Sequence, residues 1–156
     1  MAVVFISGAS SGIGRALAEH YARQGATLGL AARRADLLAT LDGELRAAGA
    51  SAVSTYPLDV ADAPALAAAA QDFIARCGAP DIVIASAGVS SGTLTECPED
   101  LAAIRRIFDI NVYGMAATFS PFIAAMRAAA ASGKALCLVS IASVAGIRGL
   151  PGAEAY

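Results

Sequence analysis

Short apolar runs alternate along this chain with longer alanine-rich stretches, and no linker or low-complexity segment interrupts the alternation. The short runs are apolar at nearly every position, which is typical of parallel strands that are buried on both faces. The pattern therefore predicts repeated strand–helix units, with one parallel sheet between two helical layers. We expect strands at 3–7, 27–32, 52–57, 81–86 and 135–140, and helices at 13–24, 35–48, 63–77 and 98–131.

Glycines stand where the expected helices end. A left-handed glycine commonly terminates a helix, and the four in question are Gly25, Gly49, Gly78 and Gly133. This order of elements predicts a doubly wound α/β fold of the Rossmann type, in three α/β/α layers. Such folds bind ligands at the carboxyl ends of the strands, near the point where the strand order reverses. We therefore look for functional residues directly after the strands.

A glycine-rich segment follows the first expected strand and opens directly into a helix, with the sequence Ser7-Gly8-Ala9-Ser10-Ser11-Gly12-Ile13-Gly14. Gly8 permits a tight turn, Gly12 lets backbone N–H groups approach a pyrophosphate, and Gly14 lets the helix pack close to the strand. The positive end of the helix dipole then faces the anion. A glycine turn without a ligand is the alternative. We favour a dinucleotide site because the strand before and the helix after both fit.

Composition limits the other classes of function. With 57% hydrophobic and 15% charged residues, the 156-residue chain has enough apolar material for one domain with a buried core. Its formal charge is -2, and its Lys and Arg residues are scattered rather than clustered. The chain therefore offers no basic surface for a nucleic acid, and we expect a small-molecule substrate instead.

Three further features bear on the compartment. Cys77, Cys97 and Cys137 fit no zinc or disulfide spacing, so we expect no metal and expect buried cysteines in a reducing compartment. The amino terminus lacks the basic and apolar segments of a signal peptide. The uncharged stretch 110–126 is short for a bilayer span and contains Asn, Gly and Pro, so we expect a buried helix and no membrane contact. Together these features predict a cytoplasmic protein.

The Gly-x-x-x-Gly-x-Gly spacing resembles the short-chain dehydrogenase/reductase family, in its common short type. Asp59, in Leu58-Asp59-Val60, matches the family's aspartate beside the adenine ring, and Ala87-Gly88 match the end of its Asn-Asn-Ala-Gly motif. Ala85 and Ser86 depart from that motif, where the family usually has asparagines that brace the sheet. The resemblance implies a cofactor site built from Gly8, Ser10, Ser11, Gly12, Ile13, Gly14, Arg33, Arg34, Asp59, Val60, Ala87 and Gly88.

The end of the second strand indicates which nicotinamide cofactor is preferred. An acidic residue there would bind the adenosine ribose and repel a 2′-phosphate, but this chain has Ala32. Arg33 and Arg34 follow, and a guanidinium at this point pairs well with a 2′-phosphate. Ser10 offers a hydroxyl to the same group. We predict NADP(H), with NAD(H) less favoured. For Arg34 a solvated helix start is an equally good interpretation.

Ser143, Tyr156 and Asn111 are the expected catalytic residues. Carbonyl reduction needs a proton donor beside the carbonyl oxygen and a second hydrogen bond to polarise it. The separation of Ser143 from Tyr156 matches the family's serine–tyrosine spacing, which implies that the tyrosine gives the proton while the serine holds the oxygen. Asn111 matches the family's asparagine that holds a water in the proton relay. A satisfied amide that bends the helix is its alternative role. Glu154 lacks a paired carboxylate at a useful spacing and receives no role.

Family members usually continue beyond the tyrosine, with a lysine four residues further on and further strands. That lysine is not in this sequence. We therefore expect residues 1–156 to form a single dinucleotide-binding domain that is the amino-terminal part of a longer single-domain chain and lacks its C-terminal strands. The resemblance also implies a homodimer or homotetramer.

Three functions fit these observations. The first is an enzyme, an oxidoreductase that transfers a hydride between NADP(H) and a carbonyl or alcohol. The second is a catalytically inactive sensor or scaffold that binds NADP(H). The third, an extended-type sugar-nucleotide epimerase, is disfavoured by the glycine spacing.

Overall fold

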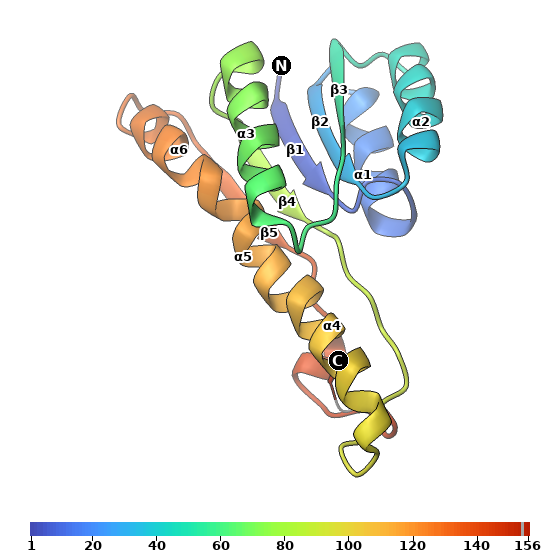
Figure 1. Cartoon of the computed structure of the whole chain (residues 1–156). Coiled ribbons are helices and arrows are strands. Elements are labelled where there is room, and N and C mark those ends of the chain that lie inside the picture. Colours follow the sequence, from blue (N-terminus) through green and yellow to red (C-terminus); the bar gives the residue numbers. More distant parts are fainter. Residues whose placement is uncertain (154) are drawn as a thin grey trace.

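The computed structural model describes residues 1–153 and 155–156, so Glu154 lies outside the described residues (Figure 1). Five parallel strands form one sheet in the order β3-β2-β1-β4-β5. The strands are β1 (Val3–Ser7), β2 (Thr27–Ala32), β3 (Ala52–Pro57), β4 (Ile82–Ala85) and β5 (Cys137–Ser140). The first three helices are α1 (Gly12–Ala22), α2 (Ala35–Ala47) and α3 (Ala63–Cys77). The predicted doubly wound fold is confirmed, and Gly25, Gly49, Gly78 and Gly133 all have positive φ.

Alternate residues of each central strand face different helices. Val4 and Ile6 of β1 pack in one cluster with side chains of α1 and α2. Phe5, between them, belongs to a second cluster on the opposite face, with Phe73 of α3 and Phe122 of the later helical run. The Phe5 ring centroid lies 5.5 Å from that of Phe73 and 4.7 Å from that of Phe122. Burial on both faces explains why the strand sequences are uniformly apolar.

The expected long helix is present as a nearly continuous helical run along one side of the molecule (Figure 1). A π-helical turn at Asp109–Tyr113 and a 3₁₀ turn at Ser120–Phe122, which contains Pro121, divide it. The proline has no N–H to donate, which accounts for the second irregularity. The α-helical segments are α4 (Leu101–Phe108), α5 (Gly114–Phe119) and α6 (Ile123–Ala130).

By length and composition alone, the run Pro98–Ala130 is long and apolar enough to cross a membrane, although one such helix is weak support for a span. Its most apolar window is 28% buried. The expected burial is therefore found on one face only, through Ile107, Ile110, Gly114, Thr118, Phe122 and Met126.

β5 lies at the edge of the sheet, and the helices cover it only in part. Leu138 is 44% exposed, and Cys137 is exposed as well. The prediction that both faces of every strand are buried is wrong for this strand, because the described helices cover its faces only in part. The prediction of buried cysteines is wrong too, because Cys77 and Cys97 are half-buried.

Asp81 ties together the amino ends of three strands. One carboxylate oxygen accepts a hydrogen bond from the Val3 N–H at 2.7 Å, and the other lies 2.8 Å from the Lys134 Nζ. Burial raises the pKa of Asp81, but the Lys134 and Val3 hydrogen bonds outweigh it and hold the pKa below its usual value of 3.8. The ionised carboxylate therefore stabilises the fold.

We expect Asp81→Asn to lower the free energy of unfolding by about 1 kcal/mol at neutral pH, because a charged hydrogen bond becomes a neutral one. A pKa lowered by folding stabilises the protein above the unfolded pKa, and the stabilisation is lost as pH falls through the folded pKa. Urea unfolding of both proteins should show the difference at pH 7 and show it shrinking as the pH falls below 3.8, the usual pKa of the carboxyl group. Asp42→Asn, which removes an i,i+4 surface pair with Arg46, should cost less than about 0.5 kcal/mol. Equal stabilities of wild type and Asp81→Asn at pH 7 would contradict this role.

Candidate functional site

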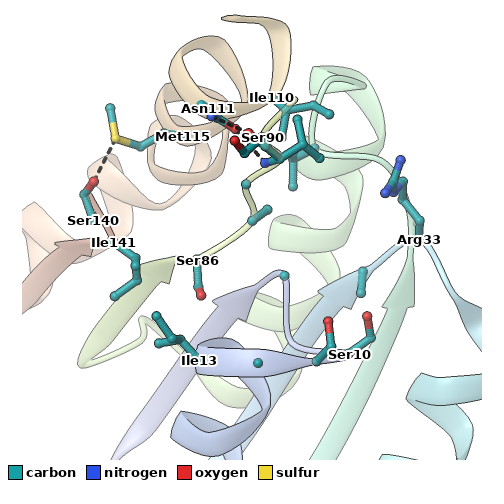
Figure 2. A pocket seen from close by; sticks show the side chains of 18 of the residues that line it. Ser10, Ile13, Arg33, Ser86, Ser90, Ile110, Asn111, Met115, Ser140 and Ile141 are labelled. Atoms are coloured by element: carbon teal, nitrogen blue, oxygen red, sulfur yellow. Dashed lines mark hydrogen bonds between the residues drawn. The ribbon is translucent and has the colours of Figure 1, made fainter. Parts of the chain in front are cut away.

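A cleft of about 830 Å³ opens at the carboxyl ends of the strands, where the sheet order reverses between β1 and β4 (Figure 2). Its volume is in the usual range for a ligand pocket. Every predicted cofactor and catalytic residue except Gly14 lines it. Those residues are Gly8, Ser10, Ser11, Gly12, Ile13, Arg33, Arg34, Asp59, Val60, Ala87, Gly88, Asn111, Ser143 and Tyr156.

The glycine turn is packed so closely that two of its positions have no room for a side chain. Gly8 has φ +73, and a Cβ there would lie 2.5 Å from the Ala87 backbone nitrogen. Gly14 does not reach the cleft, but a Cβ on it would lie 2.4 Å from the Gly8 carbonyl oxygen. Gly14 therefore lets α1 pack against the turn, as predicted. At Gly12 no described atom lies within 4 Å of a Cβ position, so this part of the turn faces open space.

The start of α1 is suited to an anion. Ser11 is the N-cap residue, and within the described residues its hydroxyl makes no capping hydrogen bond. It accepts a hydrogen bond from Arg34 Nη2 at 2.9 Å instead. The first N–H groups of the helix therefore remain available at the positive end of its dipole, beside the open space at Gly12. These features fit a pyrophosphate.

Arg33 and Arg34 are both exposed and both line the cleft, but they reach different groups. Arg34 donates to the hydroxyls of Ser10 and Ser11, at 3.2 and 2.9 Å. Arg33 points away from Ser10 in Figure 2 and is electrostatically coupled to Asp59. These two hydrogen bonds hold the Arg34 guanidinium at the glycine turn. From the sequence alone, a solvated helix start was an equally good interpretation of Arg34.

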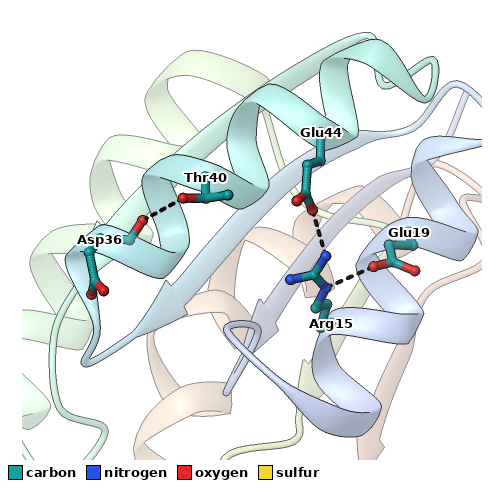
Figure 3. Close-up of polar contacts among 5 residues, drawn as sticks. All are labelled: Arg15, Glu19, Asp36, Thr40 and Glu44. Atoms are coloured by element: carbon teal, nitrogen blue, oxygen red, sulfur yellow. Dashed lines mark hydrogen bonds and ion pairs between the residues drawn. The ribbon is translucent and has the colours of Figure 1, made fainter.

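Arg15, which follows the glycine motif directly, belongs to the surface rather than to the cleft (Figure 3). Its guanidinium pairs with Glu19 at 2.9 Å and with Glu44 of α2 at 2.6 Å. Within α2, the Thr40 hydroxyl donates a hydrogen bond to the Asp36 backbone carbonyl. Arg15 therefore joins α1 to α2, on the outer side of the sheet.

Asp59 is held by groups on three sides. One carboxylate oxygen accepts from the Ala61 N–H at 3.0 Å, and the other pairs with Arg106 of α4. Burial raises the pKa of Asp59, but the Ala61 N–H, Arg106 and Arg33 together hold it below the usual range. The carboxylate is therefore ionised at neutral pH and fixed at the edge of the cleft.

Asn111 lies in the π-helical turn and binds the loop after β4. Its amide donates to the Val89 carbonyl and accepts from the Val89 N–H, both at 2.9 Å. Both functional groups of the side chain thus pair with one backbone residue, as in the alternative role of a satisfied amide. Because π-helical turns frequently occur at functional sites, the irregular backbone at Asn111 is compatible with the predicted relay role as well.

Ser143 and Tyr156 both line the cleft, as does Ser140 at the end of β5. The Ser143 hydroxyl oxygen accepts from the Ala145 N–H at 3.1 Å, which leaves its own proton free for another acceptor. Tyr156 is 42% exposed. A bridge between Thr93 and Ala153, with the Thr93 N–H donating to the Gly152 carbonyl, holds the segment that precedes Tyr156. Ser140, the nearest rival, lies 3.0 Å from the Met115 sulfur.

Several residues in or behind the cleft wall had no predicted role. Arg106, which pairs with Asp59 but does not line the cleft, is the most informative, since its position four residues before Ile110 was the only signal that it faces this side of the molecule. Among the described residues, no group of three or more His, Cys, Asp or Glu side chains could hold a metal ion. The other lining residues without a prediction are Leu58, Ser86, Val89, Ser90, Ile110, Met115, Ile141, Ala142 and Gly146.

A parallel doubly wound sheet with a glycine turn, a free helix N-terminus and a serine and tyrosine at one cleft defines a dinucleotide-binding α/β protein. The comparison with known families gives the particular kind. The family model for short chain dehydrogenases matches residues 2–156. The chain therefore belongs to the short-chain dehydrogenase/reductase family.

Two curated relatives illustrate the likeness. The chain is 40% identical over 151 residues to an uncharacterised oxidoreductase of Myxococcus xanthus, covering 97% of this chain and 57% of the relative. It is 33% identical over 151 residues to a 2-dehydro-3-deoxy-L-rhamnonate dehydrogenase (NAD(+)) of Sphingomonas sp., with the same two coverages. The chain thus spans little more than half the length of these relatives.

Solved structures agree on the fold and carry either cofactor. An alcohol dehydrogenase of Thermococcus sibiricus complexed with 5-hydroxy-NADP superposes with a TM-score of 0.89 at 28% identity, covering 100% of this chain and 64% of that one. An NAD⁺-bound xylitol dehydrogenase superposes with a TM-score of 0.87 at 25% identity, covering 99% of this chain and 58% of that one. Because the solved relatives contain either NADP or NAD, their bound cofactors do not indicate which of the two this chain prefers.

Proposed function

We propose that this protein is an NADP(H)-dependent oxidoreductase that interconverts a carbonyl and an alcohol. The observation that carries the proposal is a single cleft lined at one end by the glycine turn with Arg33 and Arg34, and at the other by Ser143 and Tyr156. One ligand that spans this cleft would contact both groups of residues. We propose a small-molecule substrate and a longer single-domain protein of which residues 1–156 form the dinucleotide-binding part.

The residues of the chain divide the reaction between them. A nicotinamide cofactor held by the glycine turn would supply the hydride that reduces the carbonyl carbon, or accept the one that leaves the alcohol carbon. Tyr156 gives its hydroxyl proton to the carbonyl oxygen in reduction and takes a proton back in oxidation. Ser143 donates its free hydroxyl proton as a hydrogen bond to the same oxygen, while Ala145 N–H fixes the Ser143 oxygen. Addition of one hydride and one proton converts the carbonyl to an alcohol.

The preference for NADP(H) rests on charge at the end of β2. Ala32 places no carboxylate beside the ribose, so nothing at this position repels a 2′-phosphate. Arg34 is already anchored by two serine hydroxyls at the glycine turn. Anchoring lowers the side-chain entropy that phosphate binding would cost. Arg33, which has no such anchor, offers a second guanidinium from the same strand end.

Binding of two adenosine probes tests the cofactor preference. We expect calorimetry to give a Kd for 2′,5′-ADP about 10- to 100-fold lower than that for 5′-AMP, since charged hydrogen bonds contribute about 1.5–3 kcal/mol. The double variant Arg33→Ala, Arg34→Ala should lose most of this difference and keep its affinity for 5′-AMP. Arg23→Ala, an exposed residue beyond α1, is the matched control and should keep the difference. Equal affinities of the wild type for both probes would remove the NADP(H) proposal.

The alternative function is a catalytically inactive sensor of the same fold. It would bind 2′,5′-ADP and NADPH with the same selectivity, but would give no turnover with any carbonyl substrate.

We also propose that the protein is a homo-oligomer and that it is cytoplasmic. Exposed apolar side chains on α4 and the π-helical turn, Phe108, Val112 and Tyr113, support a homodimer or homotetramer, and the sequence supports a cytoplasmic location.

A further inference from the structure

The ion pair between Arg106 and Asp59 joins the long helical run to the edge of the cofactor cleft. Asp59 lines the cleft and Arg106 does not, so the guanidinium reaches the carboxylate from behind the cleft wall. Their side chains are 43% and 31% exposed. On its other side Asp59 is electrostatically coupled to Arg33. The Asp59 carboxylate therefore forms an ion pair with Arg106, which does not line the cleft, and also lies in the electrostatic field of Arg33, which does line it.

The position of Arg106 is set by packing. Arg106, Ile110 and Gly114 follow at intervals of four residues and so lie on one face of the helical run. Ile110 is buried in a cluster with Val60 and lines the cleft. A Cβ on Gly114 would lie 2.7 Å from Val60 Cγ2, so the run packs directly on the loop that carries Asp59. This contact holds Arg106 against Asp59.

We propose that Arg106 is a positioning residue that sets the preference for a 2′-phosphate. By neutralising Asp59, it leaves Arg33 free to pair with a phosphate and removes a negative charge that would repel one. Without Arg106, the Asp59 carboxylate would attract Arg33 more strongly and so compete with a 2′-phosphate for that guanidinium. The inference rests on the proposed NADP(H) site and adds a residue outside the cleft to it.

The neighbouring Arg105 is a natural control. It has the same charge on the same helix, but it is 80% exposed and pairs with Asp109 at 2.9 Å. If charge anywhere on α4 were sufficient, the two arginines would be equivalent. The proposal predicts that only Arg106 matters, because only Arg106 contacts Asp59.

The test measures the ratio of the Kd for 5′-AMP to the Kd for 2′,5′-ADP by calorimetry. We expect Arg106→Gln to lower this ratio about 5-fold, as an unpaired charge at the edge of the site acts through partly screened solvent. Arg105→Gln should leave the ratio within about 2-fold of wild type, and so should Arg106→Lys, which keeps the charge. The double variant Arg106→Gln, Asp59→Asn should recover the ratio, because no unpaired carboxylate remains. Thermal unfolding checks that each variant is folded.

The outcomes separate the two proposals. A ratio near one in the wild type would remove the NADP(H) proposal itself, whatever the variants do. A large wild-type ratio that Arg106→Gln leaves unchanged would overturn the role of Arg106 alone. Equal weakening of both probes in Arg106→Gln would also overturn it, because a merely structural residue affects the adenosine as much as the phosphate. If Arg106→Gln does not fold, Arg106→Met, which also removes the charge but keeps a long side chain for packing, decides by the same ratio with and without Asp59→Asn.

Discussion

Replacement of Tyr156 by phenylalanine is expected to lower kcat by roughly 10²- to 10⁴-fold, the range that general acid–base catalysis contributes. The change removes one oxygen atom from a half-exposed side chain at the cleft. The free energy of unfolding and the Kd for NADPH should therefore stay close to wild type, within about 2-fold for the Kd. Steady-state kinetics with a carbonyl substrate, on the protein as encoded by its gene, checks the first expectation. Calorimetry with NADPH checks the second.

A pair of serines provides the matched control for this experiment. Ser143→Ala should also lower kcat, by about 10²-fold or more, because a hydrogen bond to the reacting oxygen is lost. Ser140→Ala, at the end of β5 and lining the same cleft, should change kcat by less than about 3-fold, since no reacting group is lost. A Tyr156→Phe protein with undiminished kcat would show that another group supplies the proton.

Gly8→Ala is expected to lower the free energy of unfolding by about 3 kcal/mol or more. A non-glycine residue at positive φ costs roughly 1–2 kcal/mol, and overpacking costs roughly 1–3 kcal/mol. Both apply, because Gly8 has φ +73 and the added Cβ would lie 2.5 and 2.6 Å from the Ala87 N and Cα. The neighbouring atoms are backbone, so they cannot turn aside as a side chain would. Urea unfolding measures the loss.

Gly8→Ala should also weaken nucleotide binding, since Gly8 joins the glycine turn to the loop of Ala87 and Gly88. Gly43→Ala, within α2, is the control. At Gly43 no described atom other than the chain neighbours and the helix's own backbone lies within 4 Å of a Cβ position, so alanine should stabilise the helix by up to about 1 kcal/mol. Equal unfolding free energies for Gly8→Ala and wild type would contradict the packing described for the turn.

The sequence predicted the structure best where the local geometry accepts only one type of residue. Apolar runs without alternation predicted the strands, because both sheet faces are covered around Val4, Phe5 and Ile6. Gly8 and Gly14 predicted the turn, since no other residue fits there. These inferences depend on local rules that the fold obeys.

The group with which each arginine side chain pairs could not be predicted in the same way. Arg34 donates to Ser10 and Ser11, and Arg106 pairs with Asp59. Both contacts join segments far apart in sequence, and an arginine at either position reads equally well as a solvated surface charge. The edge position of β5 likewise depends on the order of strands in space, which the sequence pattern of that strand does not contain.

Hydride transfer is the most direct test of the central claim. The protein as encoded by its gene is incubated with NADPH carrying deuterium at both hydrogen positions of the nicotinamide C4 and with a panel of aldehydes and ketones. We predict an alcohol with deuterium on the former carbonyl carbon and an equimolar amount of NADP⁺, and much less of both with Tyr156→Phe. Tight binding of NADPH with no alcohol formed from any member of a broad panel would contradict it and favour the inactive sensor.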